Sequence, residues 1–234
     1  HECEIAQSRC ASGSSSFARY WFHTRHLMVD GAKMSKSSGT FFTIRDLIER
    51  GASPAAIRLE LIKTHYRVNS NFTLQGLKDS QRQVDRWAKA HAWLAANADA
   101  ARPGPGPLVG ALERFEEALC NDLNVAGAIG VLSEAVGSIP VDAGGSGEGD
   151  GTWSEDLEAL ERMDVVLGVL GLAREATQAS DVDEAAIQVA IDARNAARDA
   201  RDWAEADRIR DELLEQGIAI KDDPEGTTWS RVIQ

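Results

Sequence analysis

The run Arg102–Pro107 (RPGPGP) constrains the fold more than any other part of the sequence. Its three prolines lack backbone donors and its glycines add conformational freedom, so no helix continues through it. Before it, an apolar pattern with a helical period covers residues 73–97, and after it similar patterns cover residues 108–120, 125–136 and 154–172. Short connections make such helices pack their apolar faces together. The sequence therefore predicts an antiparallel helical bundle.

Shorter elements are predicted before the bundle. Residues 11–16 are rich in serine and form a loop, and residues 26–30 (HLMVD) form a short strand that ends in a turn. Thr43 and Ser53 are good N-caps, so a helix is expected to begin after each of them.

The C-terminal part combines a helical pattern with a β-hairpin. Residues 142–151 and 173–182 are predicted linkers. Residues 183–217 are predicted as one helix or a helical pair that ends at a glycine, and residues 218–232 as two strands joined by a turn. This pattern predicts a small α+β tail.

Composition limits the possible classes of protein. Hydrophobic residues make up 43% of the 234, which is enough for a packed core. No apolar run approaches the roughly 20 residues that cross a bilayer, no secretory signal is visible, and three cysteines without a CxxC pair indicate reduced thiols. The net charge of −12 argues against a simple nucleic-acid binder. However, residues 1–68 carry ten Lys/Arg and six Asp/Glu, which favours an anionic ligand there.

The most informative string is Asp30–Gly39 (DGAKMSKSSG), which follows the predicted strand. Lys33 and Lys36 stand three residues apart among serines. Such a cationic loop can stabilise the charge that develops on polyphosphate oxygens, and it can close on a bound nucleotide. A solvated basic turn is the alternative for an arbitrary KxxK.

Residues 33–37 (KMSKS) resemble the signature of class I aminoacyl-tRNA synthetases, and the flanking segments narrow this resemblance. Those that resemble the cysteinyl-tRNA synthetase family are residues 1–8 (HECEIAQS), 20–23 (YWFH), 41–46 (FFTIRD), 201–211 (RDWAEADRIRD) and 226–229 (GTTW). The resemblance extends across nearly the whole chain.

This resemblance implies a mostly α fold in three parts. Residues 1–52 are expected to form the C-terminal edge of a class I Rossmann-type catalytic domain with its KMSKS loop. Residues 53–178 are expected to form the antiparallel bundle, a DALR-like tRNA-binding domain, and residues 179–234 a small α+β anticodon-recognition domain.

The resemblance also implies a reaction. The family activates L-cysteine with ATP and Mg²⁺ and then transfers it to tRNA-Cys. Lys36 matches the usual ATP contact, and Lys33, Ser35 and Ser37 share its loop, so both lysines are expected to be catalytic. His23 is expected either to line the catalytic pocket or to pack beside it.

The family holds one Zn²⁺ per subunit that selects the substrate thiol, with two cysteines, a histidine and a glutamate as ligands. Glu4 matches the glutamate, and His1 matches a neighbouring histidine that is not the main ligand. Cys3 and Cys10 match no ligand and are expected to be buried thiols. The remaining ligands and the HIGH motif are expected upstream of His1, so the isolated chain is expected not to charge tRNA.

In the family, the terminal domain reads the GCA anticodon. Asp207, Arg210 and Asp222 match base-reading residues, and Arg198 and Trp203 match supporting contacts. Arginine can donate two hydrogen bonds to guanine, carboxylates can accept from the amines of cytosine or adenine, and tryptophan can stack on a base. From the residues alone, a salt-bridged surface helix is the alternative, because Asp207 and Arg210 have the spacing of a surface pair.

Two further functions stay open. A cysteine ligase of mycothiol synthesis is a related enzyme, but that family generally lacks the anticodon tail. A non-catalytic tRNA-binding or regulatory module is the other. We expect a cytoplasmic protein without a membrane partner and a monomeric parent protein.

Overall fold

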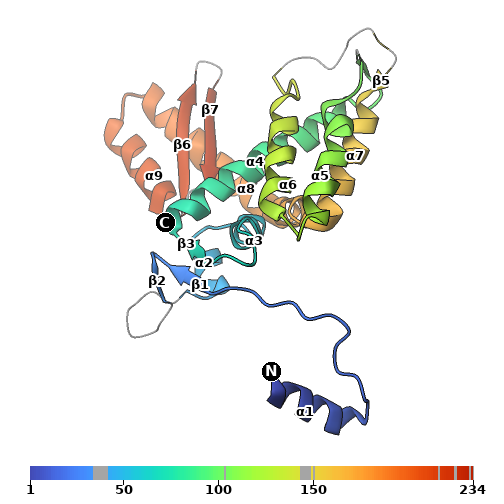
Figure 1. Cartoon of the computed structure of the whole chain (residues 1–234). Coiled ribbons are helices and arrows are strands. Elements are labelled where there is room, and N and C mark those ends of the chain that lie inside the picture. Colours follow the sequence, from blue (N-terminus) through green and yellow to red (C-terminus); the bar gives the residue numbers. More distant parts are fainter. Residues whose placement is uncertain are drawn as a thin grey trace.

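Figure 1 shows the computed structural model of the chain, which runs from an isolated helix through a small sheet into a helical bundle and a β-hairpin tail. The structure describes residues 1–33, 42–102, 104–142, 149, 151–215, 217–223, 226–231 and 233. Within these ranges it describes no side chains for residues 176–185, 215, 223, 226, 228, 230 and 231.

The N-terminal part combines three helices with a three-stranded sheet. Its elements are α1 (Glu2–Ser12), β1 (Leu27–Val29), β2 (Ala32–Lys33), α2 (Ile44–Glu49), α3 (Pro54–Ile62) and β3 (Ser70–Phe72). β1 is central, antiparallel to β2 and parallel to β3. Val29, Leu47 and Phe72 are buried in one core cluster, which also takes in Ile233 from the far end of the chain.

α1 lies apart from the other elements, joined to them by an extended segment (Figure 1). None of its residues is buried. The prediction that Cys3 and Cys10 are buried thiols is therefore wrong, because both lie exposed on this helix.

The bundle is built from four helices. They are α4 (Leu74–Ala96), α5 (Pro107–Cys120), α6 (Val125–Gly137) and α7 (Trp153–Leu167), with a short ladder between β4 (Ala101–Arg102) and β5 (Gly151–Thr152). Trp87, Phe115 and Leu160 are fully buried in their shared core. The predicted N-caps Thr43 and Ser53 are confirmed at the starts of α2 and α3, and Thr73 caps α4 in the same way, each accepting a backbone N–H.

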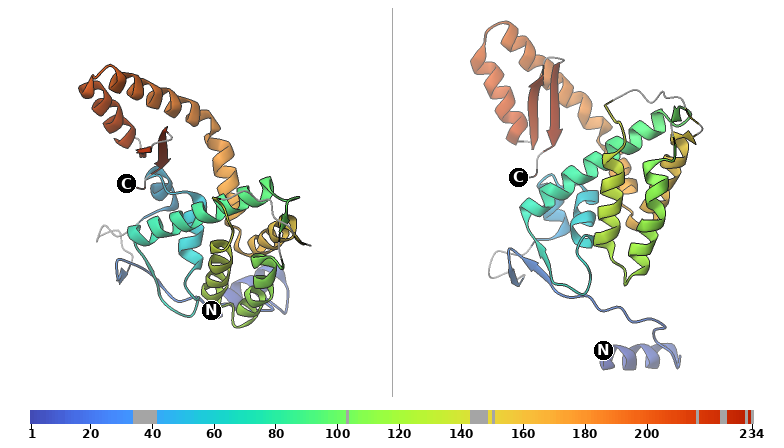
Figure 2. Two further views of the ribbon diagram at one scale, coloured as in Figure 1. Left: turned by 90° about the horizontal axis from the view of Figure 1, so that it is seen from above. Right: turned by 45° about the horizontal axis from the view of Figure 1, so that its top comes forward.

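The tail consists of α8 (Leu170–Asp199), α9 (Trp203–Glu215), β6 (Ile218–Asp223) and β7 (Gly226–Arg231). α8 begins against α3 of the N-terminal part and α4 of the bundle, and it extends out to α9 and the hairpin (Figure 2). Its distal half, α9 and the hairpin share a small core that includes Ile191 and Leu213. Neither α8 nor any other helix of the described residues is both long and apolar enough to cross a membrane.

The structure corrects one predicted connection. The fourth helix of the bundle ends at Leu167 instead of residue 172, with Gly168 in the left-handed region (φ 62°). The predicted linker at 173–182 is wrong, because α8 runs through it without a break. No glycine or proline occurs between residues 172 and 216, and Ala, Arg, Glu and Gln in this stretch are strong helix formers. The predicted domain boundary after residue 178 thus falls inside α8.

A buried ion pair fixes the start of α5. Arg102 and Asp156 are 2% and 0% exposed, and Arg102 Nε lies 2.9 Å from Asp156 Oδ2. Asp156 Oδ1 accepts from the backbone N–H groups of Leu108 (2.8 Å) and Val109 (3.3 Å). Burial raises the pKa of Asp156, while these N–H groups and Arg102 oppose that rise. One carboxylate therefore caps α5 and neutralises a buried guanidinium.

We predict that Asp156→Ala lowers the free energy of unfolding by about 3–5 kcal/mol, because the buried guanidinium loses its buried counter-charge and two N–H groups at the start of α5 lose their acceptor. Glu155→Ala is the matched control: Glu155 also contacts Arg102, at 2.8 Å, but its side chain is 58% exposed. Its loss should cost at most about 1 kcal/mol. Urea unfolding followed by tryptophan fluorescence measures both variants, and equal losses contradict the prediction.

Candidate functional site

The β1–β2 hairpin carries Lys33. Asp30 and Gly31 connect the two strands with φ of 49° and 76°, the left-handed pair that a tight two-residue hairpin favours. The side-chain Oδ1 of Asn71, on β3, accepts from the Gly31 N–H at 2.7 Å. The turn is thereby tied to the neighbouring strand, and Lys33 is exposed at the end of β2.

The chain is anchored again at residues 42–46. The Phe42 ring lies 6.2 Å from that of Phe72. Thr43 Oγ1 accepts from the Asp46 N–H at 3.1 Å, and Asp46 Oδ2 accepts from the Thr43 N–H at 2.7 Å. These two contacts lower the pKa of Asp46. Both flanks of the segment 34–41 are therefore fixed to the core of the N-terminal part.

Of the four predicted ATP contacts, the structure describes one, Lys33. Lys33 is placed by the hairpin, as given above. Ser35, Lys36 and Ser37 lie outside the described residues.

His23 lies beside α1. Its Nδ1 is 3.2 Å from Nε2 of His1, and its ring is stacked on that of Trp21 with 6.1 Å between centroids. Glu4, the predicted zinc ligand, has a side chain that is 61% exposed, with Oε2 3.9 Å from the terminal amine of His1. Structural zinc takes four N, S or O donors. Within the described part of the chain, no three His, Cys, Asp or Glu side chains gather in a way that fits a metal ion, so Glu4 belongs to no such group there.

Asp122 joins the loop after α3 to the turn between α5 and α6. Its Oδ1 accepts from the Tyr66 hydroxyl at 2.6 Å, and its Oδ2 accepts from Arg67 Nε at 2.7 Å. Arg67 and then Tyr66 lower the pKa of Asp122 to about 2, and Asp122 in turn raises the pKa of Tyr66. The Tyr66 carbonyl accepts from the Arg25 N–H at 2.8 Å. This cluster therefore positions the segment that leads into β1.

Three of the predicted anticodon residues lie on one face of α9. Trp203, Asp207 and Arg210 are spaced by four and three residues, which places them on the same side of a helix. Trp203 is 60% exposed. Arg210 contacts Asp207 and Asp211, each at 3.2 Å, through side chains that are all more than half exposed. The salt-bridged surface helix of the alternative interpretation is present, yet such exposed pairs are weak and leave their groups available to a ligand.

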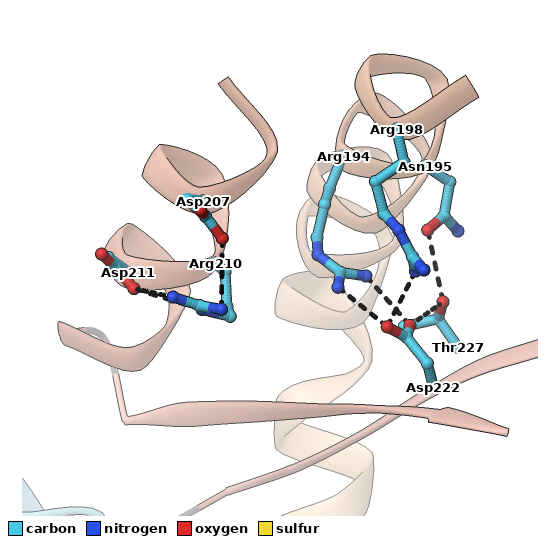
Figure 3. A network of polar contacts seen from close by, with 8 residues as sticks. All are labelled: Arg194, Asn195, Arg198, Asp207, Arg210, Asp211, Asp222 and Thr227. Carbon is cyan, nitrogen blue, oxygen red and sulfur yellow. Dashed lines mark hydrogen bonds and ion pairs between the residues drawn. The ribbon is translucent and has the colours of Figure 1, made fainter. Parts of the chain in front are cut away.

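The other two predicted anticodon residues, Arg198 and Asp222, meet between α8 and the hairpin β6–β7 (Figure 3). Arg194 Nη1 and Nη2 donate to Oδ1 and Oδ2 of Asp222 at 3.0 and 2.9 Å. Arg198 Nη1 donates to Oδ2 at 2.7 Å, and Thr227 Oγ1 donates to Oδ1 at 2.8 Å. Arg194 and then Thr227 hold the pKa of Asp222 well below its usual range. Asp222, and more weakly Asp207, raise the pKa of Arg194, so the two clusters adjoin.

Arg194 and Thr227 are not among the residues predicted from the sequence, although each has a signal there. Arg194 precedes Arg198 by one helical turn, and Thr227 opposes Asp222 across the hairpin. Asn71, which fixes the hairpin turn, has no comparable signal, because its partner Gly31 lies 40 residues away in sequence.

Three family models match consecutive parts of the chain. Residues 1–82 match the class I tRNA synthetase (C) catalytic domain, residues 114–174 the DALR domain, and residues 175–229 the cysteinyl-tRNA ligase anticodon-binding domain. The β1–β2 hairpin lies within the first match, the bundle helices α6 and α7 within the second, and α9 and β6 of the tail within the third. Fold and matches together define the chain as part of a class I aminoacyl-tRNA synthetase.

Relatives narrow this class. The chain is 40% identical to a cysteine–tRNA ligase of Afipia carboxidovorans over 98% of this chain and 46% of that protein. It is 36% identical to the enzyme of Brachyspira hyodysenteriae and 40% identical to that of Halorhodospira halophila, in each case over 99% of this chain and 49% of the relative. The chain belongs to the cysteinyl-tRNA synthetase family. It spans about half the length of these relatives.

We predict that Asp122→Asn lowers the pKa of Tyr66 towards the usual value of 10.0, because the Asp122 carboxylate is the main cause of its rise. A ¹³C NMR titration of the tyrosine rings measures this change. Asp142→Asn is the control, since Asp142 is an exposed carboxylate paired with Lys89. An unchanged Tyr66 titration in Asp122→Asn contradicts the prediction.

Proposed function

We propose that the chain acts in a cysteine–tRNA ligase, which activates L-cysteine with ATP and Mg²⁺ and transfers it to tRNA-Cys. The observation that carries this proposal is the 40% identity to such a ligase across 98% of the chain, which includes the segment matching an anticodon-binding domain. We assign residues 1–52 to catalysis, 53–178 to tRNA binding and 179–234 to anticodon recognition. A monomeric enzyme in the cytoplasm fits three unpaired cysteines in a reducing compartment.

We propose that Lys33 and Lys36 stabilise the transition state of adenylate formation. Charge accumulates on the α-phosphate and on the departing pyrophosphate, and positioned cations offset it. Ser35 and Ser37 supply further donors to ATP. The anchoring of both flanks of residues 34–41 supports this role, since fixed ends restrict where the lysines can lie. His23 is proposed to lie next to this pocket, and Glu4 is proposed as one zinc ligand.

We propose that the exposed face of α9 and the Asp222 cluster read the anticodon. Arg210 is suited to guanine, because a guanidinium donates two hydrogen bonds to O6 and N7. Asp207 and Asp222 are suited to the exocyclic amines of cytosine or adenine. Trp203 is exposed enough to stack on a base for about 1–3 kcal/mol. Arg198 is suited to a supporting contact.

The two alternatives are weaker. A cysteine ligase of mycothiol synthesis has no need of an anticodon-binding segment, and residues 175–229 match one. A non-catalytic tRNA-binding module has no need of KMSKS at residues 33–37.

The anticodon assignment is tested by tRNA binding to the 234-residue chain. We predict that Arg210→Ala weakens binding of tRNA-Cys by about 1–3 kcal/mol and abolishes the preference at one anticodon base. Arg208→Ala is the matched control on the same helix, where Arg208 pairs with Glu205 and Glu212 through a half-exposed side chain. Fluorescence anisotropy with tRNA-Cys transcripts substituted at each anticodon base gives the preferences. An equal loss on all anticodons for Arg210→Ala counts against base reading.

The catalytic assignment requires a form of the enzyme that carries these residues within a complete catalytic domain. We predict that Lys36→Ala lowers the rate of cysteine-dependent ATP–pyrophosphate exchange by about 10²–10³-fold, the cost of losing one transition-state charge contact. Lys78→Ala on α4 is the control and should leave the rate unchanged. If Lys36→Ala exchanges pyrophosphate at the normal rate, the loop does not act on ATP.

A further inference from the structure

The carboxylate of Asp222 is already saturated by the protein. A carboxylate offers about four lone-pair positions. Arg194 occupies one on each oxygen, Thr227 a second on Oδ1 and Arg198 a second on Oδ2. A base amine can therefore bind Asp222 only if one of these donors leaves.

The donors differ in how easily they leave. The side chain of Arg194 is 9% exposed and makes two hydrogen bonds to the carboxylate. The side chain of Arg198 is 39% exposed and makes one. If Arg194 moved away from Asp222, its own guanidinium would stay buried without this partner, which is strongly unfavourable. Arg198 can instead turn to solvent or to an RNA phosphate. Arg198 is therefore the exchangeable partner.

We propose that Arg194 is the positioning residue of the anticodon site: it holds the Asp222 carboxylate in a fixed plane, and Arg198 gives up its place on Oδ2 to the exocyclic amine of a base. This inference rests on the proposed function of the tail. Arg194 itself touches no base. The amine donates to the lone pair that Arg198 releases, and the freed guanidinium stays beside the RNA.

The surrounding contacts favour a preset carboxylate. A bidentate arginine fixes the plane of its carboxylate partner as well as its distance. Thr227 Oγ1 donates a further hydrogen bond to Asp222. The same oxygen lies 3.3 Å from Oδ1 of Asn195, the neighbour of Arg194 on α8. With these contacts in place, the vacated lone pair points in one direction before RNA arrives, so little side-chain ordering is left for the binding step.

The test measures discrimination and not affinity alone. The 234-residue chain is titrated with tRNA-Cys transcripts that carry GCA or an amine-to-carbonyl change, C→U or A→G, in the anticodon. The discrimination ratio is the affinity for GCA divided by that for the changed transcript. Asp222→Asn should lower one of these ratios by about 10-fold or more. Arg194→Gln should lower the same ratio as far, and Arg194→Gln combined with Asp222→Asn should lower it no further.

Two variants separate positioning from folding. Arg194→Lys keeps the charge but loses the bidentate geometry, so it should fold and still show a reduced ratio. If Arg194→Gln does not fold, the ratio of Arg194→Lys is used for the test instead. Ile191→Val lowers the stability of the tail core, where Ile191 is 1% exposed, and should leave the ratio unchanged. Arg198→Gln should weaken binding of every transcript and keep the ratio within about 3-fold, because Arg198 leaves the base-binding position.

The outcomes are distinct. A wild-type ratio in Arg194→Lys, or an equal loss of affinity for all transcripts, overturns the positioning role. If Arg210→Ala and Asp222→Asn change base preference while both Arg194 variants keep it, only this inference fails. If the wild-type chain shows no anticodon preference at all, the proposed function of the tail fails, and the inference fails with it.

Discussion

The geometry of the tail depends on the unbroken helix α8. Its first turn is fixed by Asp164, whose carboxylate accepts from the backbone N–H groups of Val169, Leu170 and Gly171. Arg58 on α3 donates to the carbonyl of Leu167 at 2.5 Å, just before α8 begins. A helix of 30 residues spans about 45 Å. The direction set at one end therefore determines where Arg194 and Arg198, near the other end, can lie.

Local signals predicted the elements well, because caps and turns depend on neighbours in sequence. Thr43, Ser53 and Thr73 each cap the helix that follows them. The stretch 173–182 misleads through its lack of an apolar period, although its composition favours a helix. Long-range contacts were beyond sequence reasoning: Arg194 and Asp222 are 28 residues apart, and only the packing of α8 on the hairpin joins them. The family resemblance indicated Asp222 as a candidate anticodon residue, but it did not indicate the arginine that holds it.

The two ionic clusters of the tail differ in burial, and this difference separates two roles. Arg210 and its two aspartates are more than half exposed, so water and salt already compete for them and a ligand can replace either carboxylate at low cost. Asp222 is held by an arginine that is almost buried. Breaking such a contact costs much free energy, because it leaves the buried arginine without its partner. The exposed cluster thus suits exchange, and the contact with the buried Arg194 suits orientation.

The tail is also held at a second point, far from α8 in sequence. Ile233 follows β7 and is 5% exposed in the core that contains Val29 and Phe72. Val29 belongs to β1 of the Lys33 hairpin, and Phe72 belongs to the neighbouring strand β3. Burying an isoleucine side chain contributes roughly 1.5–3 kcal/mol. If the β6–β7 hairpin moved away from the sheet that contains β1 and β3, either Ile233 would become exposed or α8 would have to bend. Both changes cost free energy. Because the Asp222 cluster lies between these two attachments, its position relative to the Lys33 hairpin is set by packing and not by the short turns that connect the strands.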